Sequence, residues 1–485
     1  MPIEESSSTA IPVIKNNYKE TSNQSSLLEG TNSGPALETA RGSKGQPARM
    51  SWLSWGSKGV LTLTDQGLIG GSNFLMGILL ARQLLPAQYG AYALAFEVFM
   101  VLSLAYSCLI LEPMLVFGPS TYRDNFARYF GVLLRTHFVV ALGTAILLGG
   151  AAWSLGWLGE SATLIRALEG AMIAGPCVLL FWLARRAFYV KLDPKTAVLG
   201  GLVYGTVLLA GSLTLYELRW LSAFTAFSLM ATGALAATPI LLERLRPLAT
   251  HNDTEPSLRE VSRRHWVYGR WALAGAVAAW VSGNIYYVLL SCMRGLADTG
   301  GFKALQNLTA PAGQVFSALA LLALPYAARA YKQNGRAGVE RLSWWLTALY
   351  AGGTVVYWAV LLGLEHPVMR LLYVGRYHEV EYLIPWIAVA SVFRIATVVQ
   401  MISLKAMQSP LLAFVAFAFS DAVAMLVGIP AIWLLGLQGA VYTYTLSGIT
   451  GLSAGFILLR RSARTEAGER SVSSFLTSTV GVSES

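Results

Sequence analysis

The sequence predicts an all-α integral membrane protein of about 12 transmembrane helices, arranged as two six-helix lobes related by internal duplication. Two observations predict this fold. Of the 485 residues, 55% are hydrophobic and 13% are charged, whereas a soluble domain carries about 25% charged residues. In addition, a short stretch near the first apolar segment recurs half a chain later.

Twelve apolar stretches are long enough to cross a hydrocarbon core of roughly 30 Å. Each is too long for a strand, so a helical bundle is expected. The predicted spans are 60–82, 91–117, 129–152, 163–183, 197–216, 221–243, 268–292, 303–327, 342–363, 383–405, 410–434 and 439–459.

These spans divide the chain into two lobes. We expect an N-terminal lobe over 56–243, a basic cytoplasmic linker over 244–266 and a C-terminal lobe over 267–460. Residues 1–55 and 461–485 are rich in small polar residues without periodicity, which is typical of disordered tails rather than of a signal peptide.

The repeated stretch is LLPAQYGAYAL at 84–94 and GLADTGGFKAL at 295–305, and a constant offset of 211 residues pairs Gly90 with Gly301 and Leu85 with Leu296. Each copy follows the first span of its half, and an even number of spans separates the copies. The halves therefore enter the membrane in the same direction, as parallel repeats do. Such repeats place a substrate site between two lobes.

The net charge of +10 has a topological explanation. If the N-terminus is cytoplasmic, most of the 36 Lys and Arg residues fall in cytoplasmic tails and loops, as the positive-inside rule requires. We therefore expect both termini to be cytoplasmic. Because the basic excess follows the membrane topology, we expect the protein to interact with the lipid bilayer and not with nucleic acid.

Five further stretches carry a family resemblance: 65–99, ILEPMLVFGPSTYR at 110–123, ARRAFYVKLDP at 184–194, 372–393, and LGLQGAVYTY at 435–444. They resemble the polysaccharide-transporter branch of the multidrug/oligosaccharidyl-lipid/polysaccharide flippase superfamily, over about 55–460. The resemblance implies a flippase of the bacterial inner membrane. Its substrate would be a polyprenyl-diphosphate-linked oligosaccharide, moved by alternating access for the assembly of exopolysaccharide or other cell-surface polysaccharide.

A flippase of this kind needs a polar path. Moving an unpaired hydroxyl into hydrocarbon costs roughly 2–7 kcal/mol, so a sugar headgroup does not cross a bilayer unaided. A polar cavity between two rocking lobes removes this barrier while the polyprenyl tail stays in lipid.

Polar residues in the first half are candidates for this cavity. Asp65 and Ser72 share one helical face, with Asn73 beside them, and this stripe is expected to line the cavity. For Ser72 and Asn73, hydrogen bonding to a neighbouring helix of the same half is the alternative. Glu97 is a further substrate-binding candidate.

Four ionisable residues, Asp65, Glu112, Arg135 and His137, share one depth near the cytoplasmic end of the first half. Buried charges are costly, so each needs a partner or a function. One interpretation is a structural ion-paired cluster. In the other, Arg135 binds the substrate diphosphate while Asp65 or Glu112 exchanges a proton or a sodium ion.

In the second half, Arg394 and Asp421 both fall near the middle of the membrane. They either neutralise one another or have functions. Arg394 would bind an anionic headgroup, since guanidinium binds phosphate through two parallel hydrogen bonds. Asp421 would then be a third ion-coupling candidate.

The sequence predicts no catalytic residue, cofactor or metal site. There is no phosphate-cradling glycine loop and no HExxH helix, and His366 and His378 lack ligand spacing. Two rival functions stay open. A cation-coupled multidrug antiporter of the same fold would have an acidic, aromatic cavity, whereas a membrane-embedded polysaccharide polymerase or ligase would need a substantial outer domain.

Overall fold

The computed structural model describes residues 52–245, 256–407 and 410–480, and within these ranges it contains helices and no strand. The first half comprises α1 (Trp52–Gln83), α2 (Pro86–Tyr106), a π-helical turn (Ser107–Leu111), α3 (Glu112–Phe117), α4 (Phe126–Trp157), α5 (Ala162–Val190), α6 (Pro194–Glu217) and α7 (Ala223–Leu245). The second half comprises α8 (Leu258–Met293), α9 (Leu296–Asn307), α10 (Ala310–Gly363), α11 (Glu365–Tyr373), a 3-10 turn (His378–Leu383), α12 (Ile384–Ala406), α13 (Pro410–Leu435) and α14 (Leu437–Val480).

These helices match the twelve predicted spans. Helix α2, the π-helical turn and α3 form one continuous span. Helix α10 bends at Gly335, whose φ of +62° suits a residue without a Cβ, so its first arm continues α9 and its second arm is a separate span. Ten spans among the described residues are long and apolar enough to cross a membrane. Helix α1, and α9 with the first arm of α10, complete the expected twelve.

The structure differs from the predicted domain bounds in the C-terminal tail and in the linker between the lobes. Helix α14 continues to Val480, where a disordered tail was expected from 461, because extending an anchored helix adds one hydrogen bond per residue without a new nucleation cost. Helix α8 begins at Leu258, inside the predicted linker 244–266. The predicted tail 1–55 lies almost wholly outside the described residues.

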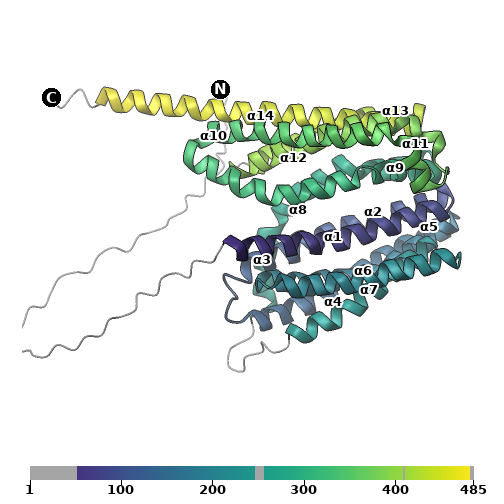
Figure 1. The fold of residues 1–485 in the computed structure, drawn as a ribbon. Coiled ribbons are helices and arrows are strands. Elements are labelled where there is room, and N and C mark those ends of the chain that lie inside the picture. The colour runs from purple at the N-terminus through teal and green to yellow at the C-terminus, as the bar shows by residue number, and fades with distance from the viewer. Residues whose placement is uncertain (1–51, 246–255, 408–409, 481–485) are drawn as a thin grey trace, which may run out of the picture. The chain divides into compact units, whose positions relative to one another are not determined.

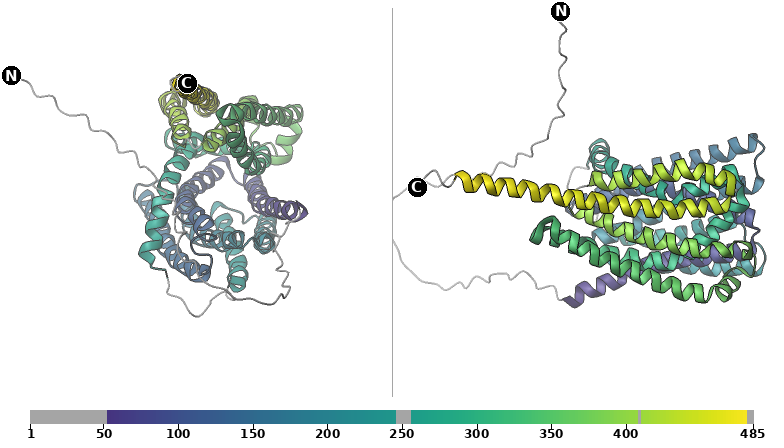
Figure 2. Two further views of the ribbon diagram at one scale, coloured as in Figure 1. Left: turned by 90° about the vertical axis from the view of Figure 1, so that its left-hand side faces the viewer. Right: turned by 90° about the horizontal axis from the view of Figure 1, so that it is seen from above.

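The two halves repeat one packing order (Figures 1 and 2). In the first half, α1 packs on α6, α4 on α5, α5 on α7, and α6 on α7. In the second half, the equivalent helices pair in the same way: α8 packs on α13, α10 on α12, α12 on α14, and α13 on α14. This agreement extends the duplication from a few sequence identities to the architecture. We call 52–245 the N-lobe and 256–480 the C-lobe.

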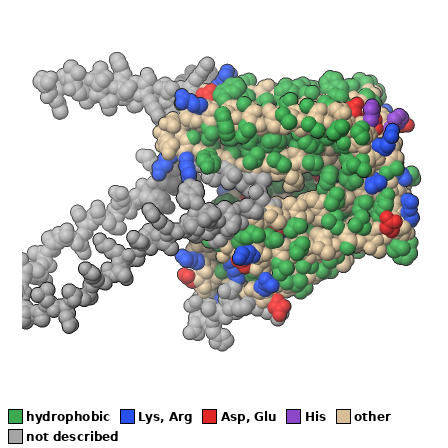
Figure 3. Space-filling view, viewed as in Figure 1, with side chains coloured by type: hydrophobic (Ala, Val, Ile, Leu, Met, Phe, Trp, Pro, Cys, Tyr) green, Lys and Arg blue, Asp and Glu red, His purple; other side chains and the backbone are tan. Residues whose placement is uncertain are grey.

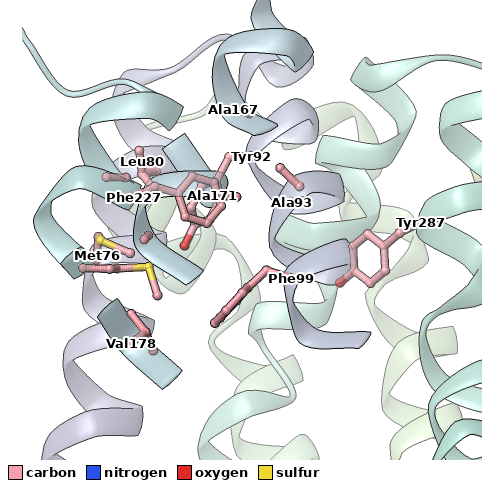
Figure 4. Packing of buried hydrophobic residues seen from close by; sticks show 14 of the residues in the cluster. Met76, Leu80, Tyr92, Ala93, Phe99, Ala167, Ala171, Val178, Phe227 and Tyr287 are labelled. Atoms are coloured by element: carbon pink, nitrogen blue, oxygen red, sulfur yellow. The ribbon is translucent and has the colours of Figure 1, made fainter. Parts of the chain in front are cut away.

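Small residues allow the helices of the N-lobe to approach closely. Ala167 and Ala171 on α5 are fully buried and meet Phe227 of α7 and Met76 of α1 in one apolar cluster (Figure 4). Tyr287 of α8 belongs to the same cluster and lies on the other side of α2 from Phe227. Helix α4, by contrast, presents apolar side chains outward, and Val139 is 72% exposed. Such a surface suits contact with lipid acyl chains.

Candidate functional site: the seam between the lobes

At one end of the molecule the lobes meet through α2 and α9, the helices that carry the repeated stretch. We call this the hairpin end, because the turns α1–α2 and α8–α9 lie there. A Cβ on Gly90 would lie 1.7 Å from the carbonyl oxygen of Leu296, and a Cβ on Gly300 would lie 2.2 Å from that of Pro86. The contact is reciprocal, as expected where two copies of one motif face each other. Only glycine permits so close an approach.

Three polar contacts reinforce the closed hairpin end. Asn307 Nδ2 donates to Tyr89 Oη at 2.7 Å, with both groups buried. Arg376 Nη1 donates to the carbonyl of Leu84 at 3.1 Å. Lys303 Nζ lies 3.4 Å from Glu97 Oε1, and this ion pair also joins α9 to α2.

At the opposite end, which we call the tail end, α8 packs against the π-helical turn of the N-lobe. Pro113 has no amide N–H, so it cannot donate to Leu109 four residues earlier, and the helix widens there. The carbonyl of Leu109 instead accepts a hydrogen bond from His265 Nδ1 at 2.9 Å. Tyr129 donates to His265 Nε2 at 2.7 Å. Buried His265 thus joins the two lobes as a neutral imidazole, and burial lowers its pKa.

The seam is asymmetric. Whereas α8 packs closely on α2 and the π-helical turn, its counterpart α1 meets α9 and α10 at few points. One of them is Gln314, whose Nε2 would lie 2.9 Å from a Cβ on Gly70. Gly67 and Gly71 of α1 have open space beside them. The space-filling view shows a recess between the two lobes on this face (Figure 3).

Asp65 faces the interior of the N-lobe and not the seam, in contrast to our expectation for its stripe. Its Oδ2 accepts from Arg185 Nη1 at 3.1 Å and from the hydroxyl of Tyr189, and the carboxylate is fully buried. Gly201 of α6 leaves space for it, since a Cβ there would lie 2.7 Å from Oδ1. Helical spacing identified the face of α1 correctly but could not determine which neighbour that face meets.

Ser72 and Asn73 also make their hydrogen bonds within the N-lobe. Ser72 Oγ donates to the carbonyl of Leu68 at 2.6 Å. Asn73 Nδ2 donates to Ile69 at 2.8 Å, and its Oδ1 accepts from Tyr204 at 3.3 Å. The bond from Tyr204 of α6 to Asn73 fits the alternative of hydrogen bonding to a neighbouring helix of the same half. Ser72 instead bonds to carbonyls of its own helix.

The expected cluster of Asp65, Glu112, Arg135 and His137 is divided in the structure. Arg135 lies on the exposed side of α4, while buried His137 pairs with Tyr106 at 3.0 Å. Glu112 interacts electrostatically with Arg186 of its own lobe and with Tyr268 of α8. Asp65 has Arg185 in place of Arg135, because α5 packs inside the lobe and α4 at its edge.

Arg394 lies in a cavity of about 320 Å³ inside the C-lobe. Its Nη1 donates to the carbonyl of Ser282 at 3.0 Å, and its guanidinium lies 4.5 Å from the ring centre of Tyr444. Asp421 interacts electrostatically with it. The walls carry many hydroxyl groups, from Ser282, Ser391, Thr397, Ser420, Ser447 and Tyr444.

Two important cations were missed by sequence reasoning. Arg185 falls just beyond the predicted span 163–183 and Lys303 at the first residue of the predicted span 303–327, because span ends were set by hydropathy alone. One signal was present for Arg185. It precedes Arg394 by 209 residues, close to the repeat offset of 211, and both arginines lie on the fourth span of their lobe and face the first.

The chain has the fold of transporters in the superfamily that the sequence resembles. It is similar to an inward-facing multidrug resistance MATE family transporter of the MOP superfamily, with a TM-score of 0.68 and 13% identity over 84% of this chain and 99% of that chain. It is also similar to an outward-facing multidrug resistance MATE family transporter of that superfamily, with a TM-score of 0.61 and 10% identity over 84% of this chain and 94% of that chain. A third similar structure is the lipid II flippase MurJ in an inward closed conformation, with a TM-score of 0.61 and 11% identity over 83% of this chain and 87% of that chain.

The sequence comparisons add no closer assignment. No protein-family model matches the chain, and no curated protein matches it by sequence. The similarity to the solved structures confirms the all-α, two-lobed fold.

Proposed function

From this shared fold, we propose that the protein is a flippase that moves polyprenyl-diphosphate-linked oligosaccharide across the bacterial inner membrane for cell-surface polysaccharide assembly. The hairpin end would face the periplasm and the tail end the cytoplasm, in agreement with the distribution of basic residues. Alternating access would proceed by rocking of the N-lobe against the C-lobe.

The asymmetric seam is the observation that carries this proposal. A lipid-linked glycan needs a polar space for its headgroup and a side opening for its tail. The weak contact of α1 with α10, beside a recess between the lobes, would supply such an opening (Figure 3). The tight α2–α8 contact on the other side can act as the pivot.

Substrate contacts are proposed from residues that meet the seam or a cavity. Arg394 remains a candidate for the diphosphate, because its cavity holds both a guanidinium and several hydroxyl groups. Glu97 lies directly at the seam. The exposed position of Arg135 and the internal bonds of Ser72 and Asn73 give those three candidates less support.

Ion coupling is proposed for the carboxylates, with Asp65 first. Its Oδ1 is buried and has no hydrogen-bond partner among the described residues, so a proton or a sodium ion could bind there. In the C-lobe, Asp421 Oδ1 is likewise buried without a hydrogen-bond partner among the described residues. Glu112 is the third candidate for ion coupling. Asp65→Asn should remove the ion dependence of transport; unchanged transport with unchanged ion dependence would refute its coupling role.

A cation-coupled multidrug antiporter is the second candidate, favoured by the MATE neighbours and by fully buried Asp65. Reconstitution in liposomes distinguishes the two functions. Labelled polyprenyl-diphosphate glycan and a cationic dye are offered separately to the same protein. We expect the glycan to cross faster than in empty liposomes and the dye not to cross. The reverse result would establish the antiporter.

A further inference from the structure

Lys303 occupies an unusual position between the lobes. It lies on α9, three residues beyond the close contact of Gly300 with α2, and its ammonium group lies 3.4 Å from Glu97 Oε1. The same Nζ lies 5.3 Å from the ring centre of Phe96 and 5.3 Å from that of Tyr287. Phe96 and Glu97 belong to the N-lobe, and Tyr287 belongs to the C-lobe. The ammonium group of Lys303 therefore contacts both lobes.

These contacts hold only while the hairpin end is closed. Opening that end would separate Lys303 from both Glu97 and Phe96. The side chain of Lys303 is 18% exposed and that of Glu97 is 7% exposed, so each charge is largely removed from water. Breaking such a pair without a replacement is strongly unfavourable, since it leaves two partly buried charges uncompensated. The pair therefore opposes opening in the absence of another anion.

We propose that the substrate diphosphate replaces Glu97 as the partner of Lys303, and that this exchange releases the hairpin end. Lys303 is then a substrate-binding residue and Glu97 its counter-ion in the empty transporter. The inference rests on the proposed function, because it takes the anionic group to be the diphosphate of a lipid-linked glycan.

The position and chemistry of Lys303 favour it over the buried arginines for this role. Arg185 is paired with Asp65 inside the N-lobe, and Arg394 donates to Ser282 inside the C-lobe. Neither of these contacts crosses the seam. A lysine ammonium on a flexible stem can also change partners by rotating its side chain, whereas a guanidinium fork is fixed by planar geometry.

A labelling experiment tests the exchange. Ala93 is fully buried and shares the seam face of α2 with Gly90 and Glu97, so Ala93→Cys reports on opening of the hairpin end. The background replaces Cys108, Cys177 and Cys292, of which Cys292 is exposed. Labelling by a membrane-impermeant maleimide is measured in proteoliposomes without ligand, with polyprenyl diphosphate in the bilayer, and with inorganic pyrophosphate in solution.

Without ligand, the reporter protein should label slowly, and Glu97→Gln and Lys303→Gln should each raise the labelling rate roughly tenfold or more. Polyprenyl diphosphate should accelerate labelling of the protein with Lys303 intact and leave Lys303→Gln unchanged. Acceleration by pyrophosphate alone would show that the phosphates suffice; acceleration only by the lipid form would show that the tail is also needed. Either result supports the exchange.

The charge swap Glu97→Lys with Lys303→Glu is the decisive variant. It should restore slow labelling, since an ion pair joins the two positions again. Glu169→Gln, which breaks an exposed pair with Arg166 inside the N-lobe, is the matched control and should behave as the parent. Each variant is first checked for a single symmetric peak in detergent size exclusion.

Two results would overturn the inference: slow labelling of Glu97→Gln without ligand, or acceleration of Lys303→Gln by diphosphate to the same extent as the parent. The liposome assay separates this failure from failure of the proposed function. A protein that flips the glycan with no diphosphate-dependent labelling refutes the exchange alone. A protein whose labelling responds to diphosphate while no glycan crosses refutes the flippase.

Discussion

Arg185 Nη1 lies 3.1 Å from Asp65 Oδ2, and the two side chains are 6% and 0% exposed. The pair connects α5 to α1 inside the N-lobe and holds the most buried carboxylate of the ion-coupling candidates. Removing one partner of such a pair leaves the other charge without compensation in an apolar surrounding.

We therefore expect Arg185→Met to lower the stability of the protein by about 3–5 kcal/mol. The double variant with Asp65→Asn should recover most of this loss, because it removes both charges. Thermal unfolding in detergent measures the effect, with Arg166→Met in the exposed Arg166–Glu169 pair as a control that should change by less than about 1 kcal/mol. An Arg185→Met protein as stable as the parent would show that the pair contributes little.

The close approach of α2 and α9 gives a second prediction. Gly90→Ala places a methyl group where the carbonyl of Leu296 already lies, so the lobes must separate at the hairpin end, at a cost of about 1–3 kcal/mol to the closed state. Maleimide labelling at Ala93→Cys should rise. Gly67→Ala, which faces open space, should leave labelling unchanged. Equal labelling of both variants would mean that the glycine contact does not hold the hairpin end closed.

His265 gives a pH-dependent prediction at the tail end. Burial lowers its pKa, so the folded protein favours the neutral imidazole. Its contribution to stability is complete above the unfolded-state pKa of about 6.5 and is lost as pH falls from there toward the lowered pKa.

The parent protein should thus lose more thermal stability than His265→Gln between about pH 7.5 and pH 5.5, a range that spans the usual histidine pKa. The comparison uses the difference between the two proteins, since Glu260 and Arg264 lie nearby on the same helix and are paired with each other. Identical pH profiles would show that His265 does not titrate in this range.

Arg394 gives a test of function rather than of stability. We expect Arg394→Ala to reduce glycan flipping at least about tenfold, because a cation for the diphosphate is lost, while the protein stays monodisperse in detergent. Arg394→Lys retains the charge and should retain part of the activity. Loss of folded protein in Arg394→Ala would instead favour mutual neutralisation with Asp421.

Hydropathy and the repeat predicted the twelve spans and the two lobes, since both depend on composition and order along the chain. The sequence did not predict which charged side chains pair with one another. Asp65 was expected near Arg135 because they share a depth, but depth does not specify which helices are neighbours. Lys303 falls at the first residue of the predicted span 303–327, and the sequence does not identify its partner. Only the three-dimensional pairing of α2 with α9 reveals that Glu97 neutralises it inside the seam.

We expect the two lobes to separate at the hairpin end during transport of an anionic lipid-linked substrate. Spin labels at Trp157→Cys on the N-lobe and Leu371→Cys on the C-lobe, which are 83% and 71% exposed, allow the distance between the lobes to be measured by pulsed electron spin resonance. We predict a single shorter distance in the empty protein and an additional longer one when polyprenyl-diphosphate glycan is added. One unchanged distance with the glycan, or the longer distance only with a cationic drug, would contradict the account.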